Sequence, residues 1–254
     1  MEHVREKAMK MGHPQAIQMS HVDTSHDARL SQLIAAIYDA ALDSALWPEV
    51  LATIAEFVDG RVGGLLTKDA IKQEVNAHWH AGGDPHYLRL YAETYSRLGP
   101  VAISPPGQLA EIVSIPDLMP YDEFRRGRFY REWAEPQGWV DVAVAVLDKS
   151  ASGSAYLTMS RDTDTGMVDA TMRERLALIV PHVRRAVQIG KAIEFKRAES
   201  ATFMDVLDGL SLGLFLIDAQ GRIVHANAAG GDMLGAGDLL RSVGGRLAAG
   251  DTRV

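Results

Sequence analysis

The chain has 254 residues, of which 47% are hydrophobic and 23% charged, and its formal net charge at pH 7 is -7. These totals are typical of a soluble globular protein with one or two domains. The acidic balance argues against sequence-independent binding of nucleic acid, which needs clustered Lys and Arg, and the lack of cysteine excludes disulfides, thiolate zinc sites and a cysteine nucleophile.

No apolar run approaches the roughly 18 to 20 residues that span a bilayer. The first residues also lack the apolar core of a secretion signal. We therefore expect a cytoplasmic protein that has no contact with membranes. Residues 1–25 are polar and show little periodicity, so they are expected to form a mobile N-terminal arm.

A helix is expected from Ser25, because the apolar residues that follow recur at helical spacing. A second helix is expected from Trp47 to Asp59, with Pro48 in its first turn. These two helices are expected to form a hairpin that packs on a sheet. Further elements are expected in this order: strands at 61–67 and 74–81, a helix at 85–98, a loop at 98–109, a short strand at 111–115 and a helical stretch at 117–133.

The strongest strand signals in the chain lie at residues 139–147 and 154–161, which are dense in Val, Ala, Tyr, Leu and Thr. A polar turn joins them. The order of a helix hairpin, mixed strands, an antiparallel hairpin and a closing helix predicts an α+β domain over residues 26–170. This order is typical of GAF/PAS-like sensory domains.

Residues 171–208 are expected to form a helical connector, because apolar residues recur there at three- or four-residue steps. Pro181 removes a backbone donor, so the segment is either kinked or divided into two helices. The opposite, basic face is either solvated or part of a linker that pairs with a second copy. The candidate pairing positions are Leu176, Ile179, Val183 and Val187.

The periodicity changes after Ala201. An apolar run ends at Ile217, Asp218 to Gly221 supply turn chemistry, and a strand is expected up to Asn227, so this stretch predicts a β-hairpin. After Leu240 the glycines interrupt what is expected to be a short tail, and no helix-turn-helix pattern fits there.

The string GLFLIDAQGRIVHANAAG resembles the opening of a PAS sensory domain. In such domains the first strand ends in an acidic residue, a Gly turn follows, and the second strand runs into an Asn. Asp218, Gly221 and Asn227 occupy those places in this chain. The resemblance implies a partial PAS-like domain over residues 209–254.

Two longer strings resemble the N-terminal sensory part of bacterial LuxR-type helix-turn-helix transcriptional regulators. They are PYDEFRRGRFYREWAEPQGWVDVAVAVLDKS and RERLALIVPHVRRAVQIGKAIEFKRAESATFMDVLDGLSLGLFLIDAQGRIVHANAAG. The resemblance begins near Leu30 and implies a sensory domain, a helical connector, a PAS-like domain and a C-terminal DNA-binding domain. Only 54 residues (254 minus 200) follow Ser200, so no direct DNA binding is expected from this chain. It is expected to be a fragment, a frameshifted product or a stand-alone regulator.

Aromatic side chains, interspersed with arginines, are concentrated in the middle of the chain. Such residues line small-molecule pockets that are apolar with a few polar anchors, and they equally form ordinary cores. The candidate ligand-binding residues are Tyr87, Tyr91, Tyr121, Phe129, Trp133 and Trp139.

Two further motifs have the residue types of a metal site and of a hydrolase nucleophile. Strand alternation would place His78 and His80 on one face, near His86, where three imidazoles would hold a divalent metal. No Asp or Glu shares that face, so we expect no metal. The G-x-S-x-G pattern around Ser211 follows a helix and precedes a strand, whereas a nucleophile elbow has the reverse order.

We therefore expect no catalytic residue and no cofactor. The predicted function is that of a cytoplasmic signal-sensing regulatory protein, related to LuxR-type transcriptional regulators, that binds a small ligand or a partner. It would act as a homodimer or as a heterodimer with a full-length regulator. Two alternatives stay open: a small-molecule enzyme that uses the aromatic and histidine region, and an inert truncated remnant of a transcription regulator. The enzyme alternative lacks an acid/base pair or a nucleophile at a suitable spacing.

Overall fold

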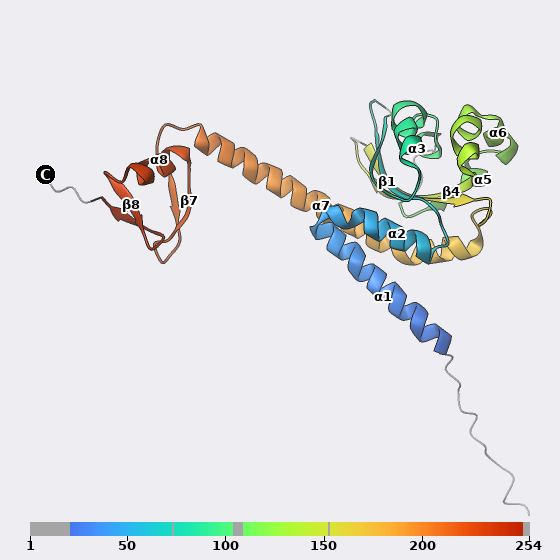
Figure 1. Ribbon diagram of the computed structural model, residues 1–254, viewed down its shortest axis with the longest axis horizontal. Helices are drawn as coiled ribbons and strands as arrows, with labels where there is room; N and C mark the ends of the chain where they lie inside the picture. Colours follow the sequence, from blue (N-terminus) through green and yellow to red (C-terminus); the bar gives the residue numbers. More distant parts are fainter. Residues whose placement is uncertain (1–20, 73, 104–108, 152, 251–254) are drawn as a thin grey trace, which may run out of the picture. The chain divides into compact units, whose positions relative to one another are not determined.

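A computed structural model describes residues 21–72, 74–103, 109–151 and 153–250 (Figure 1). The chain forms two compact units, residues 1–186 and residues 187–254. The long helix α7 (Ala170–Asp208) begins in the first unit and ends in the second. Most of the predicted N-terminal arm lies outside the described residues. No helix among the described residues is long and apolar enough to cross a membrane.

The first unit is built on a five-stranded antiparallel sheet with the strand order β2-β1-β5-β4-β3. The strands are β1 (Gly63–Asp69), β2 (Val75–Ala81), β3 (Ile112–Val113), β4 (Trp139–Lys149) and β5 (Gly153–Asp162). The predicted pair at 139–147 and 154–161 is confirmed as β4 and β5, which pair along almost their whole length. All five predicted strands of this region are present.

One face of the sheet is covered by α2 (Trp47–Phe57) and the first half of α7 (Figure 1). Helix α1 (His21–Leu42) packs against α2, and a short 3₁₀ turn, η1 (Ser44–Leu46), lies between them. The predicted helix hairpin is confirmed, although α1 begins four residues before Ser25. Ile37, Ile54 and Ile179 are completely buried in this layer. Burial of side chains of this size contributes about 1.5–3 kcal/mol each, so the layer carries much of the stability of the unit.

The other face is covered by short helical segments. They are α3 (Pro85–Leu90), η2 (Tyr91–Tyr95), α4 (Pro100–Ile103), α5 (Ile115–Leu118), α6 (Tyr121–Arg126), η3 (Tyr130–Ala134) and η4 (Glu135–Gln137). The helical stretch predicted at 117–133 is divided into the end of α5, α6 and η3, because Pro120 and Gly127 interrupt it. The predicted loop at 98–109 contains α4, and residues 104–108 lie outside the described residues.

Helix α7 runs through Pro181 as one element of 39 residues. Leu176, Ile179 and Val183 are at most 1% exposed, because they pack into the core of their own unit. This corrects their prediction as pairing positions: their apolar stripe is covered by the chain itself. Val187 is half-buried and belongs to the second unit.

The first turns of α7 are anchored to the first unit by two arginines that were expected on a solvated or pairing face. Arg173 donates to Ser114 Oγ at 2.7 Å, to the Ile112 carbonyl at 2.8 Å and to Asp117 Oδ2 at 2.6 Å. Burial raises the pKa of Asp117, but the hydrogen bonds from Arg173 and Ser114 outweigh it, so the pKa lies below its ordinary value. Arg175 donates to the Phe57 carbonyl and to Asp59.

The described part of the second unit, up to residue 250, contains two β-hairpins and one helix besides the end of α7. Its elements are β6 (Phe215–Ile217), β7 (Ile223–Ala226), α8 (Ala228–Ala236), β8 (Leu240–Val243) and β9 (Arg246–Ala249). The predicted hairpin is confirmed as β6 and β7. The segment after Leu240, predicted as a tail, is a second hairpin. Gly244 and Gly245 form its turn with positive φ, which side chains other than glycine rarely adopt.

Asn227 organises this second unit. Its side chain is 1% exposed, and its Oδ1 accepts from the amides of Leu214 and Gly230 at 2.8 and 2.9 Å. Its Nδ2 donates to the carbonyls of Leu207 and Leu212, both at 2.8 Å. The residue therefore caps α8 and ties the end of α7 to the first strand, with the whole hydrogen-bonding capacity of its amide satisfied.

Candidate functional site

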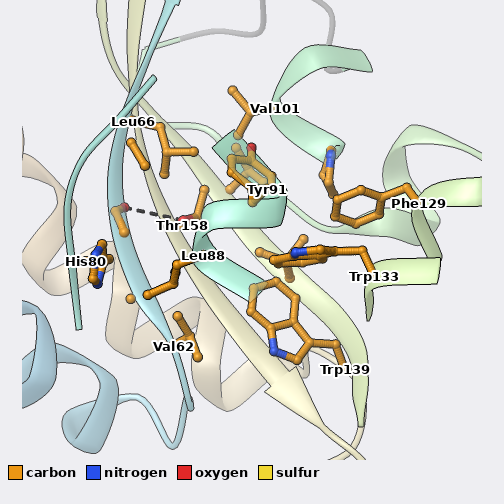
Figure 2. A pocket seen from close by; sticks show the side chains of 16 residues that line it. Val62, Leu66, His80, Leu88, Tyr91, Val101, Phe129, Trp133, Trp139 and Thr158 are labelled. Atoms are coloured by element: carbon orange, nitrogen blue, oxygen red, sulfur yellow. Dashed lines mark hydrogen bonds between the residues drawn. The ribbon is translucent and has the colours of Figure 1, made fainter. Parts of the chain in front are cut away.

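An apolar cavity of about 70 Å³ lies between the sheet and the layer of short helical segments (Figure 2). The sheet contributes its floor and the helical segments its roof. The lining residues are Val62, Gly63, Gly64, Leu66, Ala77, His80, Leu88, Tyr91, Pro100, Val101, Phe129, Trp133, Trp139, Val142, Val144 and Thr158. The cavity thus belongs entirely to the first unit.

The floor is set by the register of the three central strands. Gly64, Thr158 and Val144 are direct cross-strand neighbours, so they lie on one face of the sheet. The next residues on each side of Val144, Ala143 and Ala145, face the opposite layer. A Cβ at Gly64 would come within 3.0 Å of Leu66 Cδ1 and of Thr158 Oγ1, so the absence of a side chain there keeps the floor open.

The roof is aromatic and is formed by two π-helical turns. Tyr91 begins η2 and Trp133 lies in η3; the centroids of these two rings are 5.3 Å apart, and Phe129 stands 4.9 Å from Trp133. In η2 the Ser96 amide donates to the Tyr91 carbonyl at 2.8 Å, five residues back. Such turns occur frequently at functional sites, because the inserted residue re-aims the side chains around it.

Two hydrogen bonds join the parts of the roof to each other. Trp133 Nε1 donates to the Tyr87 carbonyl at 2.7 Å, which ties η3 to α3. The Tyr95 hydroxyl donates to Glu132 Oε2 at 2.9 Å, and Arg128 donates to both oxygens of the same carboxylate. The roof is therefore one connected layer, although it is assembled from short segments.

Few polar groups face the cavity. Among the described lining residues there is no carboxylate, lysine or arginine; the polar side chains are His80, Tyr91, Thr158 and the two tryptophans. Thr158 Oγ1 donates to the Gly64 carbonyl at 3.3 Å. The Tyr91 hydroxyl makes no hydrogen bond to any described residue, and burial raises its pKa far above the ordinary value. It is a neutral group available to a ligand.

A polar pocket of about 400 Å³ adjoins the cavity. Its lining residues are Arg61, Val62, Gly83, Asp84, Tyr87, Pro136, Gln137, Trp139 and Asp162. Val62 and Trp139 line both spaces, and Figure 2 shows them at the end of the cavity opposite Val101. Burial raises the pKa of Asp162, but hydrogen bonds from Arg61 and Thr165 outweigh it and lower this pKa to about 2.

The structure brings together four of the six predicted ligand-binding residues in the cavity: Tyr91, Phe129, Trp133 and Trp139. Tyr87 lines the polar pocket instead. Tyr121 lines neither space, which corrects its prediction: its hydroxyl donates to the Val140 carbonyl at 2.7 Å, so it fastens α6 to β4. The sequence reasoning missed the floor, although the alternation of Val142 and Val144 with alanines in β4 marks one face of the sheet.

The strand alternation expected for His78 and His80 is not present. A β-bulge pairs Leu65 with Trp79 and Leu66 with Ala77, so His78 is the extra residue and the strand alternation is broken there. His80 lines the cavity, whereas His78 Nε2 lies 2.7 Å from Thr67 Oγ1. Within the described ranges, no group of three His, Cys, Asp or Glu side chains is placed to hold a metal ion.

The G-x-S-x-G motif around Ser211 lies between a helix and a strand, as the sequence indicated. Ser211 lies between the end of α7 and the start of β6, so a helix precedes it and a strand follows. A nucleophile elbow needs a serine at the start of a helix, beside oxyanion donors. The geometry around Ser211 therefore gives no support to a hydrolase.

Comparison with known proteins bears on both units. A family described as PAS domain matches residues 201–252, a stretch that contains Asp218, Gly221 and Asn227. The VqsR LBD (ligand-binding) domain of Pseudomonas aeruginosa superposes with a TM-score of 0.51 at 12% identity, over 68% of this chain and 98% of that one. No curated protein matches the sequence.

Two other solved structures resemble the chain more weakly. They are CepR2 of Burkholderia cenocepacia, titled an N-acylhomoserine lactone dependent LuxR family transcription factor (TM-score 0.47, 16% identity, 63% of this chain and 94% of that one), and the GAF domain of a putative sensor histidine kinase from Pseudomonas syringae pv. tomato (TM-score 0.44, 16% identity, 70% and 97%). The chain is an α+β protein with a GAF/PAS-like fold, as the sequence predicted.

Proposed function

We propose that the first unit is a sensory domain that binds a small, mainly apolar molecule in the cavity and reports its presence through α7. The observation that supports this is the cavity itself, an aromatic-lined space with few polar groups. Small-molecule sites are usually concave spaces of this kind, lined by hydrophobic and aromatic side chains with a small number of polar groups. The absence of a carboxylate or lysine from the described lining favours binding over catalysis.

The size of the cavity limits what enters without rearrangement. At about 70 Å³ it is smaller than the 150 Å³ engineered cavity that holds benzene, and well below the roughly 300–1,000 Å³ of sites for drug-sized ligands. A short alkyl segment fits; a larger ligand has to displace part of the roof. The roof consists of short segments joined by few hydrogen bonds, so it is the layer that would move.

A route from the cavity to α7 follows from the shared sheet. Ser114 directly follows β3, the edge strand of the sheet, and Asp117 lies in α5. Both side chains bind Arg173 of α7, so a shift of this edge of the sheet alters the position of α7 directly. A ligand shifts α7 from one position to another only if it binds the protein more tightly in one of these positions than in the other. The proposed regulator is thus a binding module with a mechanical output.

The test compares two core substitutions on opposite faces of β4. Val144→Phe fills the cavity, whereas Leu147→Met changes the opposite face at nearly constant volume. Wild type and Leu147→Met are expected to gain thermal stability with toluene, 1-hexanol or 1-octanol, as binding to the native state requires. Val144→Phe is expected to gain none while it retains its near-UV circular dichroism. If no probe raises the melting temperature of the wild type, the proposal is wrong.

We further propose that the regulator pairs with a second copy, or with a related full-length regulator, through the second half of α7. Ile189, Lys196 and Phe203 follow one another at seven-residue steps, as do Ile193, Ser200 and Leu207, which is the spacing of a coiled-coil seam. Phe203 is 64% exposed, so an apolar part of this seam is uncovered in the single chain. A shallow apolar groove lies between Ile189 and Ser200.

Sedimentation equilibrium tests this pairing with two charge insertions on α7. Ile193→Glu places a carboxylate in the seam and is expected to raise the dimer dissociation constant at least tenfold. Ala198→Glu places the same charge on the opposite side of the helix and is expected to leave the constant unchanged. A wild-type chain that stays monomeric at every concentration contradicts the pairing but not the ligand site.

A further inference from the structure

We infer that the polar pocket next to the cavity recognises an ammonium group, so that the ligand is an amphipathic amine with an apolar end in the cavity. This inference rests on the proposed ligand-binding function and adds the chemical class of the ligand. It uses the residues of the polar pocket, which the apolar cavity by itself does not involve.

The two spaces are positioned to accept one molecule. Val62 and Trp139 line both spaces, so the two spaces adjoin at these side chains. Trp139 is held in place because Trp133 packs edge-on against it, with ring centroids 4.6 Å apart. A ligand with a short alkyl or aryl end in the cavity therefore presents its other end to the polar pocket. The cavity sets the length of the apolar part, and the polar pocket sets the head group.

The charges of the polar pocket favour a cation. Arg61 is the one basic residue among the described residues of its lining, and it already pairs with Asp162 and, at 3.4 Å, with Asp164. Asp84 forms no ion pair with any described residue. The lining of the polar pocket thus holds two carboxylates, Asp84 and Asp162, and one guanidinium, so its formal charge is negative, and an anionic ligand would have to displace Asp162 from Arg61.

The hydrogen-bonding groups of the polar pocket lead to the same ligand class. Asp84 Oδ1 accepts from the His86 amide at 2.8 Å, and its second oxygen makes no hydrogen bond to the described part of the chain. Gln137 Nε2 donates one of its N–H groups to the Trp133 carbonyl at 2.7 Å, and its oxygen remains an acceptor. Asp84 and Gln137 thus offer accepting oxygens, and an ammonium group is a donor only.

Aromatic faces complete the polar pocket. Tyr87 and Trp139 both line it, and a cation within about 6 Å of such a ring is attracted by the negative face of the π system. Carboxylates together with aromatic rings are the combination that distinguishes an organic amine from an alcohol of equal length.

The experiment uses three probes of one length: hexylammonium, 1-hexanol and hexanoate. Isothermal titration of the full chain measures the dissociation constant of each at neutral pH and at low salt. The key variant is Asp84→Asn, because asparagine caps a helix as well as aspartate does and so removes the charge without removing the cap of α3. Asp122→Asn, an exposed change on α6 outside both spaces, is the matched control.

Hexylammonium is expected to bind at least tenfold more tightly than 1-hexanol to the wild type and to Asp122→Asn, and hexanoate more weakly than either. In Asp84→Asn the preference for the amine is expected to fall below threefold while the affinity for 1-hexanol is unchanged. Equal binding of the amine and the alcohol, or tighter binding of hexanoate, overturns the ammonium inference but leaves the apolar site standing. If none of the three binds, the proposed ligand-binding function fails as well.

Discussion

The two units of this chain are stabilised by different means. Every buried apolar side chain among the described residues lies at or before Ala186. In the described part of the second unit only Asn227 and Gly230 are buried. The first unit therefore depends on a hydrophobic core, and the second on hydrogen bonds around one asparagine. Helix α7 takes part in both: its first half is buried in the hydrophobic core, and the Leu207 carbonyl near its end accepts a hydrogen bond from Asn227. The contribution of each turn of α7 to stability therefore depends on what surrounds that turn.

The aromatic residues make the two units separable in experiments. All four tryptophans and all seven tyrosines precede Val187 in the sequence, so intrinsic fluorescence and near-UV circular dichroism of these residues report on the first unit alone. Hydrogen exchange measured by mass spectrometry reports on both. Each prediction below names the unit in which its effect should be confined.

The largest effect is expected from Ile179→Ala in α7. Ile179 is completely buried, so the substitution removes buried methyl groups, leaves a cavity and should cost about 3–4 kcal/mol. The same change at Ile193, which is half-buried in the second unit, should cost less than about 0.5 kcal/mol. Urea unfolding followed by tryptophan fluorescence measures the cost at Ile179, and hydrogen exchange of the second unit measures the cost at Ile193. Equal costs at the two positions would remove the distinction between the two halves of α7.

Asn227→Ala should have the next largest effect, in the second unit only. The change leaves two amides and two carbonyls without their partner, at a cost of about 2–3 kcal/mol. Residues 209–236 are expected to exchange amide hydrogens much faster, while tryptophan fluorescence is unchanged. Asn227→Asp keeps the acceptor and loses the donors, so its amide exchange should be faster than that of wild type and slower than that of Asn227→Ala. Unchanged protection in Asn227→Ala would show that apolar contacts hold this unit.

Acid titration should reveal a smaller, charged contribution to the first unit. The pKa of Asp162 is lowered from 3.8 to about 2, so its ionised form stabilises the native state above pH 4, and this contribution is lost as the pH falls through 2. Allowing for its partial exposure, it amounts to about 1–2 kcal/mol.

The measurement compares the unfolding free energies of wild type and Asp162→Asn at intervals between pH 5 and pH 2. Their difference should shrink by that amount over this range, because only the wild type loses an ionised partner of Arg61. A difference that stays constant with pH would mean that the pair with Arg61 adds nothing to stability beyond what asparagine supplies.

The smallest effects come from two glycines of the second unit and have opposite signs. Gly221 has a φ of 76° in the β6–β7 turn, so Gly221→Ala should cost about 1 kcal/mol. Gly231 lies in α8 with open space around it, so Gly231→Ala should stabilise by up to about 1 kcal/mol. Hydrogen exchange of the unit measures both. The same sign for both substitutions would mean that local backbone preference does not govern this unit.

Local signals were sufficient wherever the structure depends on neighbours in sequence. The strand-forming residues of β4 and β5 pair across a single turn, and the turn chemistry of Asp218 and Gly221 lies within a few residues of the contacts that it makes. The GAF/PAS-like fold class followed from the order of such elements. Breaks at Pro120 and Gly127 were visible in the sequence but outweighed by the apolar spacing around them.

The candidate site required the tertiary structure. Tyr91 and Tyr121 are both aromatic residues in helical segments, yet only Tyr91 lines the cavity, because the π-helical turn that it begins sets its direction. His78 left its expected place because the bulge that displaces it depends on pairing with Leu65 and Leu66. Neither the turn nor the bulge has a signature in the residues themselves.

The sequence by itself determined most elements of the first unit, their order and the apolar stripe of α7, because periodicity and turn residues are properties of adjacent positions. Only the tertiary structure decided what covers that stripe: Leu176, Ile179 and Val183 meet the core of their own unit, whereas Phe203 meets solvent. The physical reason is that the hydrophobic effect specifies that a surface leaves water without specifying its partner. The partner is selected by the path of the whole chain.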